Sequence, residues 1–321
     1  MTLHINEAEV RQILTMPMAL AAVEEISRKQ ATGEVVVHPR KRFELPSGGG
    51  FFHYMAAMDT AAGFIAMKQY TYVKGALRFL VPLYEISTGA LLALIEADFM
   101  GQQRTGAASG VATKYLARQN ARTAAILGTG GQAKTQLEAI ALVRKLEAVR
   151  VYGRDPERRE AFCTEMSKRL GIPVQPANSA SAAVREADIV NTATTSPKPV
   201  LDGRDIAEGA HINAIGANHA HKRELDDAAI SRSGVIFVDS REQSRQEAGD
   251  LVIPFEEHPE KWSAVHELYE LIGGKVPGRT SASQITLFKS SGIASWDLAV
   301  VQKVYALAKQ KSLGRELPLF Q

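Results

Sequence analysis

The feature that most constrains this chain is a glycine-rich turn between an apolar strand and a helix. A strand pattern that starts at Thr123 runs into Gly128-Thr129-Gly130-Gly131-Gln132-Ala133, and a helical pattern of apolar residues follows. Gly128 permits a tight turn, Gly130 lets the backbone approach a pyrophosphate, and Ala133 is small enough for close helix packing. Amides at the start of the helix would face the phosphates. The turn therefore predicts a dinucleotide-binding fold.

The residues after the next predicted strand indicate which dinucleotide binds. An NAD site usually has an Asp or Glu there, whereas this chain has Gly153 and then Arg154, with Arg158 and Arg159 one turn into the next helix. Arg154 carries most of this inference, since a solvated helix face would also show the other two arginines. Asp155-Pro156 is better interpreted as a helix N-cap and first helical residue than as the missing acid. We therefore expect NADP(H) to be favoured over NAD(H).

Composition limits the remaining classes of protein. A chain of 321 residues with 45% hydrophobic and 23% charged residues is expected to form two globular domains. A net charge of +3 without long basic runs argues against a nucleic acid partner. The single cysteine, Cys163, cannot form an internal disulfide and is expected to pack inside a helix. The absence of a signal-like start and of a long apolar run predicts a cytoplasmic protein without membrane segments.

The predicted fold is α/β, with a Rossmann domain at residues 117–294. Strands and helices alternate there, as in a doubly wound parallel sheet. Before it, a helical pattern from Ile5 to Ala31, with its apolar stripe broken near Pro17, precedes about five β-rich segments between Val35 and Glu96, which predict an antiparallel sheet. An amphipathic helix, Trp296 to Lys309, is expected to return to this first domain, residues 1–116 with 295–321. A partner subunit is one way to cover such a sheet.

Several cationic residues are candidates for binding an anion. Lys68 lies among apolar residues of a predicted strand, as a functional lysine or as an edge-strand lysine that protects the sheet. Arg104 is predicted to begin a helix, where the macrodipole disfavours a cation, so we expect substrate, a phosphate or a structural carboxylate beside it. Arg40 and Arg42 share one face of an extended segment, although exposure to solvent is their default interpretation.

A second group of polar residues ends a strand of the predicted Rossmann sheet. The segment Asn213 to His219 closes at the edge where doubly wound folds hold their ligands, so Asn218 is expected near the nicotinamide. A lone His219 is more often a solvated loop residue. No spacing of His, Cys and Glu indicates a metal site, and no Gly-x-Ser-x-Gly elbow indicates a hydrolase.

Five segments in this order are informative together. They are Gln103–Ala112, Ile126–Ala133, Asn213–Ala217, Lys222–Asp226 and Thr286–Ala294. With them, nearly the whole chain resembles the ornithine cyclodeaminase/mu-crystallin family. The resemblance implies a Rossmann domain and an N-terminal β domain that pairs with its twin in a homodimer.

The resemblance also implies roles for particular residues. Family members hold the substrate carboxylate with an arginine, a lysine and a second arginine. These match Arg42 or Arg40, Lys68 and Arg104, with the spacing in favour of Arg42. His53 lies where family members place differing substrate-reading side chains, and is a candidate for specificity. The residues expected to bind the dinucleotide are Arg104, Thr105, Gly128, Thr129, Gly130, Gly131, Gln132, Gly153, Arg154, Arg158, Thr192, Ala193 and Gly216.

One position departs from part of the family. Cyclodeaminases and the related alanine dehydrogenases carry an aspartate where this chain has Asn218, and an amide cannot exchange protons at neutral pH. Mu-crystallin-like ketimine reductases also lack that acid. Reduction of a preformed cyclic C=N bond needs only hydride and one proton, which water, Lys68 or His53 could supply. Lys68, Asn218 and His53 are therefore the candidate catalytic residues.

These observations predict an NADPH-preferring reductase of a small cyclic imino acid, such as 1-pyrroline-2-carboxylate or 1-piperideine-2-carboxylate. Arg42, Lys68 and Arg104 would clamp the carboxylate so that the imine carbon faces the nicotinamide. One alternative is an ornithine cyclodeaminase or an alanine-type amino acid dehydrogenase, against which Asn218 and Gly153 argue. Another is a non-catalytic NADPH-binding protein, against which the intact set of cations argues.

Overall fold

The computed structural model describes residues 1–46 and 48–319, and the chain divides into two compact units. One unit is formed by Met1–Arg104 with Gly292–Gln321, and the other by Thr105–Ser291. The predicted domain boundaries, after residues 116 and 294, lie C-terminal to these. The chain passes from the first unit to the second inside helix α3 (Asp98–Leu116). The last two residues of the predicted first domain lie outside the described residues.

The first unit is built on a seven-stranded sheet in the order β15-β1-β6-β5-β4-β3-β2. Its centre confirms the predicted antiparallel sheet of five strands. These are β2 (Val35–Glu44), β3 (Gly50–Asp59), β4 (Phe64–Val73), β5 (Ala76–Glu85) and β6 (Leu91–Glu96). Two short strands were not predicted, because three or four residues carry too little alternation to recognise. They are β1 (Thr2–Ile5), parallel to β6, and β15 (Arg315–Leu317), antiparallel to β1.

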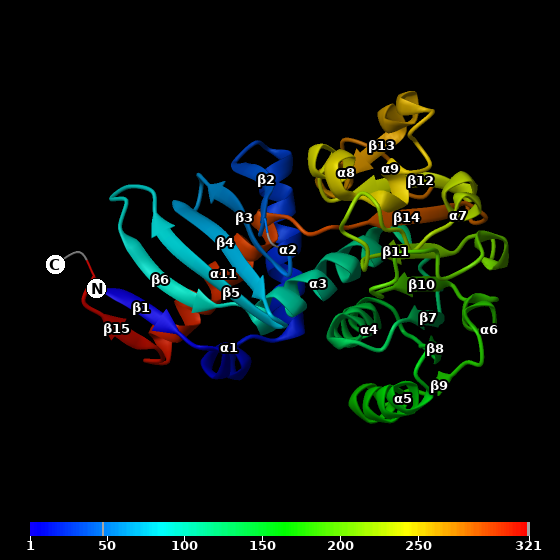
Figure 1. Cartoon of the computed structure of the whole chain (residues 1–321), viewed down its shortest axis with the longest axis horizontal. Helices are drawn as coiled ribbons and strands as arrows, with labels where there is room; N and C mark the ends of the chain where they lie inside the picture. Colours follow the sequence, from blue (N-terminus) through cyan, green and yellow to red (C-terminus); the bar gives the residue numbers. More distant parts are fainter. Residues whose placement is uncertain (47, 320–321) are drawn as a thin grey trace. The chain divides into compact units, whose positions relative to one another are not determined.

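Two long helices cover one face of this sheet. Helix α11 (Ala294–Gln310) packs on β2 to β5 and against α2 (Met16–Ala31), which confirms the predicted return helix (Figure 1). The predicted helical region from Ile5 to Ala31, with its break near Pro17, is confirmed as two helices, because α1 (Glu7–Ile13) ends before α2 begins at Met16. Pro17 lies in the first turn of α2, where its missing amide has no helical partner to lose.

The second unit has an all-parallel sheet in the order β13-β12-β14-β11-β10-β7-β8-β9, which confirms the predicted doubly wound fold. Its strands are β7 (Thr123–Leu127), β8 (Ala148–Tyr152), β9 (Val174–Pro176), β10 (Ile189–Thr192), β11 (His211–Ala214), β12 (Ser233–Val238), β13 (Val265–Glu267) and β14 (Ile285–Lys289). The chain first adds β8 and β9 on one side of β7, and it then adds β10 and the later strands on the other side. The strand order therefore reverses between β7 and β10, where folds of this kind bind ligands.

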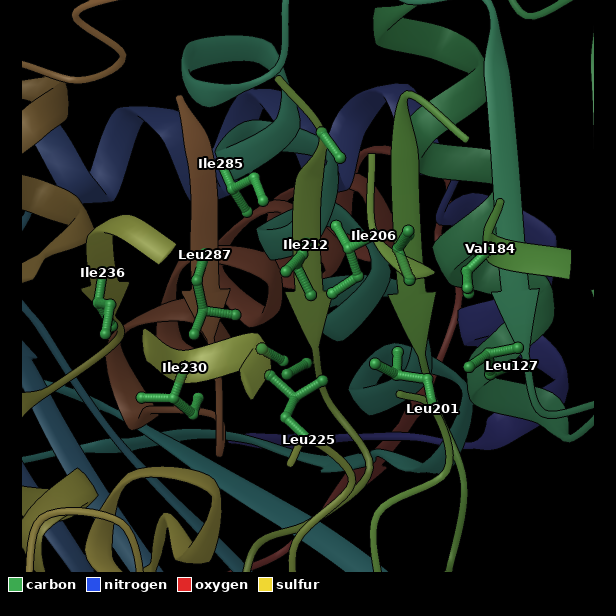
Figure 2. Packing of buried hydrophobic residues seen from close by; sticks show 14 of the residues in the cluster. Leu127, Val184, Leu201, Ile206, Ile212, Leu225, Ile230, Ile236, Ile285 and Leu287 are labelled. Carbon is green, nitrogen blue, oxygen red and sulfur yellow. The ribbon is translucent and has the colours of Figure 1, made fainter. Parts of the chain in front are cut away.

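Alternation along β7 builds a hydrophobic core on each face of this sheet. Ala124 and Ile126 pack with the helices α4 (Gly131–Val143) and α5 (Pro156–Leu170). Leu127 packs on the other face with α6 (Ala180–Val184) and α7 (Asp227–Arg232), in the core that Figure 2 shows. Cys163 lies buried in the first core, and burial raises the pKa of its thiol to about 11, which confirms it as a packing residue.

The remaining elements of the second unit are short. They are helices α8 (Arg241–Glu247), α9 (Gly249–Val252) and α10 (Leu268–Ile272), with 3-10 turns at Gly203–Asp205 and Pro259–Ala264. In residues 1–46 and 48–319, no helix has both the length and the apolar character that a membrane span requires. Within the same residues, no group of three His, Cys, Asp or Glu side chains could hold a metal ion.

Candidate functional site

Lys68 is buried in the middle of the first unit's sheet. Strand β4 lies between β3 and β5, so the interpretation of Lys68 as an edge-strand lysine is wrong. The residue is 4% exposed, and its Nζ lies 3.1 Å from Oδ1 of Asp297. Burial is the main cause that lowers the Lys68 pKa to about 8. Arg104 and Arg40 act in the same direction and Asp297 opposes them. Lys68 is therefore able to exchange a proton near neutral pH.

Arg104 lies inside a helix rather than at its start. Helix α3 begins at Asp98, so the predicted helix start at Arg104 is wrong, and the argument from the macrodipole does not apply. Gly101 lies inside this helix, and its lack of a side chain leaves room for Lys68. A Cβ on Gly101 would lie 3.0 Å from Nζ of Lys68. Arg104 is 5% exposed and donates from Nε to Oδ1 of Asp297 at 3.0 Å. The structural carboxylate considered as its partner is therefore present.

An irregularity in β2 determines which of two arginines joins this cluster. The pairing of β2 with β3 shifts register between His38 and Lys41, so the residues between them leave the regular alternation. Arg40 is 6% exposed and donates from Nη2 to the carbonyl oxygen of Gly292 at 3.2 Å. Arg42 is only half-buried. The structure thus places Arg40 with Lys68, against the spacing argument for Arg42, and exposure to solvent is wrong as the default for Arg40.

Asp297 is the member of the cluster that sequence reasoning missed. It lies in the first turn of α11 and is 1% exposed; its Oδ1 is shared by Lys68 and Arg104. Its Oδ2 has no hydrogen-bond partner in the described part of the chain. Lys68 and Arg104 carry two positive charges against the one negative charge of Asp297, which leaves an excess of +1 when these three groups are ionised. Because buried charge without compensation is costly, the cluster is suited to an anion.

A glycine at the start of the return segment makes space for this cluster. Gly292 has φ +83°, and a Cβ there would lie 2.3 Å from Nη1 of Arg104. Any other residue would strain the backbone and displace the guanidinium. The sequence did carry a signal for Asp297, since a lone acid in the apolar helical segment Ala294–Val301 has no obvious solvent-facing role.

Aromatic side chains lie next to the cations. His53 is buried, with its Nδ1 3.1 Å from the hydroxyl of Tyr70 and its ring stacked on Phe51 at 4.0 Å between centroids. The Nζ of Lys68 lies 5.1 Å from the ring centroid of Phe79 and 5.9 Å from that of Tyr70. His53 therefore belongs to an aromatic surface beside Lys68, and such a surface can contact a small ring.

The glycine-rich turn has the geometry that a dinucleotide requires. Gly128 has φ +115°, and a Cβ there would lie 2.4 Å from the carbonyl oxygen of Ala193. Gly130 is the N-cap of α4, and a Cβ on it would meet no atom within 4 Å, so its backbone is open to a ligand. In α3, a Cβ on Gly106 would lie 2.4 Å from the carbonyl oxygen of Thr135, which explains the glycine at this position. The residues present therefore fit the pyrophosphate of a dinucleotide.

The end of β8 is basic, and it has no room for an acid. A Cβ on Gly153 would lie 2.9 Å from Cγ2 of Thr129. Arg154 is exposed, as is Arg158, whose Nε lies 3.5 Å from Asp155. Asp155 accepts a hydrogen bond from the amide of Arg158 at 3.1 Å, which confirms its interpretation as a helix N-cap. Arg159 instead donates to the carbonyl oxygen of Gly153 at 3.1 Å, so it supports the strand end.

The other predicted cofactor residues lie at strand ends or in a neighbouring helix. Thr192 ends β10 beside the point where the strand order reverses, and Ala193 follows it; Gly216 follows β11. Asn218 is half-buried two residues further on, as is His219, whose ring centroid lies 5.5 Å from that of His221. Gln132 belongs to the first turn of α4, and Thr105 is 9% exposed within α3.

Comparisons with known proteins agree with both units. The model of the ornithine cyclodeaminase/mu-crystallin family matches residues 2–312. The Delta(1)-pyrroline-2-carboxylate reductase of Bacillus cereus is 39% identical over 245 residues, which are 76% of this chain and 75% of the relative. Thermococcus litoralis Delta(1)-pyrroline-2-carboxylate reductase, solved in complex with NADH and L-proline, has a TM-score of 0.94 and 35% identity over 98% of this chain and 100% of that one. An archaeal alanine dehydrogenase dimer with bound NAD has a TM-score of 0.93 and 33% identity over 99% of each chain.

Proposed function

Because the chain belongs to the ornithine cyclodeaminase/mu-crystallin family, we propose that it reduces the C=N bond of a small cyclic imino acid to the cyclic amino acid with a nicotinamide cofactor. The observation that carries the proposal is the buried cluster of Arg40, Lys68 and Arg104, in which Lys68 and Arg104 share one carboxylate oxygen of Asp297. The Bacillus cereus and Thermococcus litoralis reductases make 1-pyrroline-2-carboxylate the first substrate to test. The six-membered 1-piperideine-2-carboxylate is the second.

The cluster orients the substrate by its carboxylate. A carboxylate bound beside Lys68 and Arg104 would offset the positive charge that Asp297 leaves uncompensated, so binding lowers an electrostatic cost of burying these two cations. An arginine can bind both carboxylate oxygens at once, which fixes direction as well as position. The aromatic surface of His53 and Tyr70 is suited to contact the apolar edge of the ring. Orientation is therefore the main contribution of this unit to catalysis.

Lys68 is the proposed source of the proton. Reduction of a C=N bond adds hydride to carbon and a proton to nitrogen, and a bound nicotinamide supplies the hydride. The lowered pKa of Lys68, about 8, lets its ammonium group protonate the ring nitrogen and recover a proton from solvent at neutral pH. Asn218 cannot exchange a proton, so it serves only as a hydrogen-bonding group. This favours reduction of an imine over deamination of an open-chain amine.

The proposed cofactor preference is NADP(H). Its support is the basic end of β8, where Arg154 is exposed and position 153 is a glycine rather than an acid that would repel a 2'-phosphate. The Thermococcus litoralis relative was solved with NADH, so both cofactors belong in the assay. A ratio of NADPH to NADH efficiency below one would refute the preference without touching the proposed reaction.

The proposed reaction is tested by cofactor oxidation with each cyclic imine, run beside ammonia release from L-ornithine and NAD reduction with L-alanine. We expect loss of NADPH that depends on an imine, with no ammonia release. Ammonia release from L-ornithine would refute the argument from Asn218 and support a cyclodeaminase. NAD reduction that depends on L-alanine would instead support an alanine-type dehydrogenase, whose substrate could use the same three cations.

We also propose a homodimer through the face of the first unit's sheet that α11 does not cover. On β3 the residues of that face, Phe52, Tyr54 and Met58, are only half-buried, and Phe43 on β2 is 59% exposed. Contiguous apolar surface of this kind is typical of an interface between subunits. Light scattering should give twice the chain mass, and Met67→Glu on this face should lower it, whereas Leu142→Glu on α4 should not. A monomeric wild-type protein would refute the proposal.

A further inference from the structure

A buried carboxylate joins two turns at the C-terminal edge of the parallel sheet. Glu224 is fully buried, and both of its oxygens accept hydrogen bonds. Oε1 accepts from the amide and the hydroxyl of Thr194, at 2.6 and 2.7 Å. Oε2 accepts from the hydroxyl of Thr192 at 2.8 Å and from the amide of Gly216 at 2.7 Å. One side chain therefore holds the turn after β10 and the turn after β11.

The two turns are in direct contact at this point. A Cβ on Gly216 would lie 2.2 Å from the carbonyl oxygen of Thr194 and 2.5 Å from Oε1 of Glu224. Only a glycine lets the backbones approach so closely. The backbone amides of Thr194 and Gly216 can only donate, and each bonds a different oxygen of Glu224. In a glutamine at position 224, one of these oxygens would be replaced by an NH2 group, which would face a backbone amide that also donates.

A second buried pair extends the network to the end of β14. Lys289 is fully buried; its Nζ lies 2.9 Å from Oδ2 of Asp250 and donates to the carbonyl oxygen of Ala217. Asp250 accepts the amides of Glu224 and Leu225 through Oδ1, at 2.6 and 2.8 Å. The ends of β10, β11 and β14 are thereby fixed to one another.

The network lies at the edge of the sheet where a fold of this kind holds its cofactor. The strand order reverses between β7 and β10, and a dinucleotide lies across the carboxyl ends of the strands at such a point. Its pyrophosphate is expected at the turn after β7, so the nicotinamide half extends over the turns after β10 and β11. Those are the turns that Glu224 holds. Asn218 follows directly after Ala217, the residue that Lys289 binds.

We propose that Glu224 is a positioning residue. It fixes the turns after β10 and β11, which the nicotinamide ring contacts, and Asp250 and Lys289 support it. The proposal rests on the proposed function, since it concerns the same cofactor site. Small displacements of reacting groups cost rate far more than they cost binding. Loosening these turns should therefore lower kcat while KM for the imino acid, set by the cations of the first unit, stays unchanged.

The test compares Glu224→Gln with Glu242→Gln, which makes the same chemical change at an exposed position of α8. Glu224→Gln should lower kcat roughly tenfold or more with KM for the imino acid unchanged, and Glu242→Gln should change neither. Hydrogen exchange, measured without substrate, should show faster exchange in the peptides that contain Thr194 and Gly216. Because that readout needs no turnover, it tests the network even if the wild-type protein reduces neither imine, a result that would refute the proposed function alone.

Thr192→Val provides a milder variant in case Glu224→Gln does not fold. It is nearly isosteric and removes one donor to Oε2 of Glu224, so it should lower kcat in the same direction by a smaller factor. Wild-type kcat in both variants would overturn the proposal. A lower kcat accompanied by a lower melting temperature and by faster exchange throughout the second unit would also overturn it, because that pattern indicates a structural role only.

Discussion

Replacing Lys68 by Met should make the folded chain more stable at neutral pH while abolishing turnover. The lysine is 4% exposed and lies beside Arg104 and Arg40, so its charge is held at a cost that Asp297 only partly offsets. Methionine has a similar length and no charge, and Asp297 keeps its bond to Arg104 in the variant. The folded state therefore loses an unfavourable charge without losing the packing of the side chain.

The lowered pKa gives the size of this effect. A fall from 10.5 to about 8 is roughly 2.5 pKa units, and at about 1.4 kcal/mol per unit it corresponds to ~3 kcal/mol. Below the folded pKa of about 8, Lys68 is charged in both the folded and the unfolded chain, so the full cost is present. Between that value and 10.5 the unfolded chain binds a proton that the folded chain releases, so wild-type stability rises with pH. Above 10.5 the cost vanishes.

Urea unfolding of the ligand-free proteins, followed by tryptophan fluorescence, measures this difference. Lys68→Met should gain about 3 kcal/mol at neutral pH and clearly less near pH 10, whereas Lys168→Met, at an exposed position of α5, should show neither change. A Lys68→Met variant that is less stable than wild type at neutral pH, or whose gain persists unchanged near pH 10, would refute the reasoning. NADPH binding should be spared, and unchanged turnover would remove Lys68 from the mechanism.

Three further predictions concern binding. Arg40→Ala should raise KM for the imino acid roughly tenfold or more while Arg42→Ala leaves it near wild type, which steady-state kinetics would show; equal effects would contradict the choice of Arg40. Gly292→Ala should raise KM by displacing Arg104 without changing NADPH affinity in a fluorescence titration, and a loss of NADPH affinity would argue against this. Gly153→Asp should weaken the binding of both cofactors because of the contact with Thr129. Adding Thr129→Ala should restore NADH binding in preference to NADPH, and a double variant that still binds NADPH more tightly would contradict this origin of the preference.

Local patterns predicted the parts of this protein whose cause is local. The turn at Gly128 requires a positive φ and the cap at Asp155 requires a neighbouring amide, so a few adjacent residues determine both. The alternation of strands and helices likewise indicated the parallel sheet. The short strand β1 was not predicted, because it is stabilised by pairing with β6 rather than by a pattern in its own sequence.

The cation cluster could be predicted only in part, because distant segments determine it. The register shift in β2 depends on pairing with β3, and this shift, not the spacing of the arginines, buries Arg40. Asp297 meets Lys68 across 229 positions of sequence. Glu224 is similar: its partners at Thr192 and Gly216 come from separate strand ends, and no short motif contains them all.

The discontinuity of the first unit has a consequence for the order in which the chain acquires its structure. During synthesis the strands that carry Arg40 and Lys68 leave the ribosome early, whereas Asp297 and the helix that bears it emerge only after the whole second unit, Thr105–Ser291. Until then Lys68 and Arg104 lack Asp297, and the sheet lacks α11. The second unit, continuous in sequence, is able to fold first. The first unit is therefore completed only after the second unit has been synthesised, and Lys68 and Arg104 acquire Asp297 only when α11 arrives.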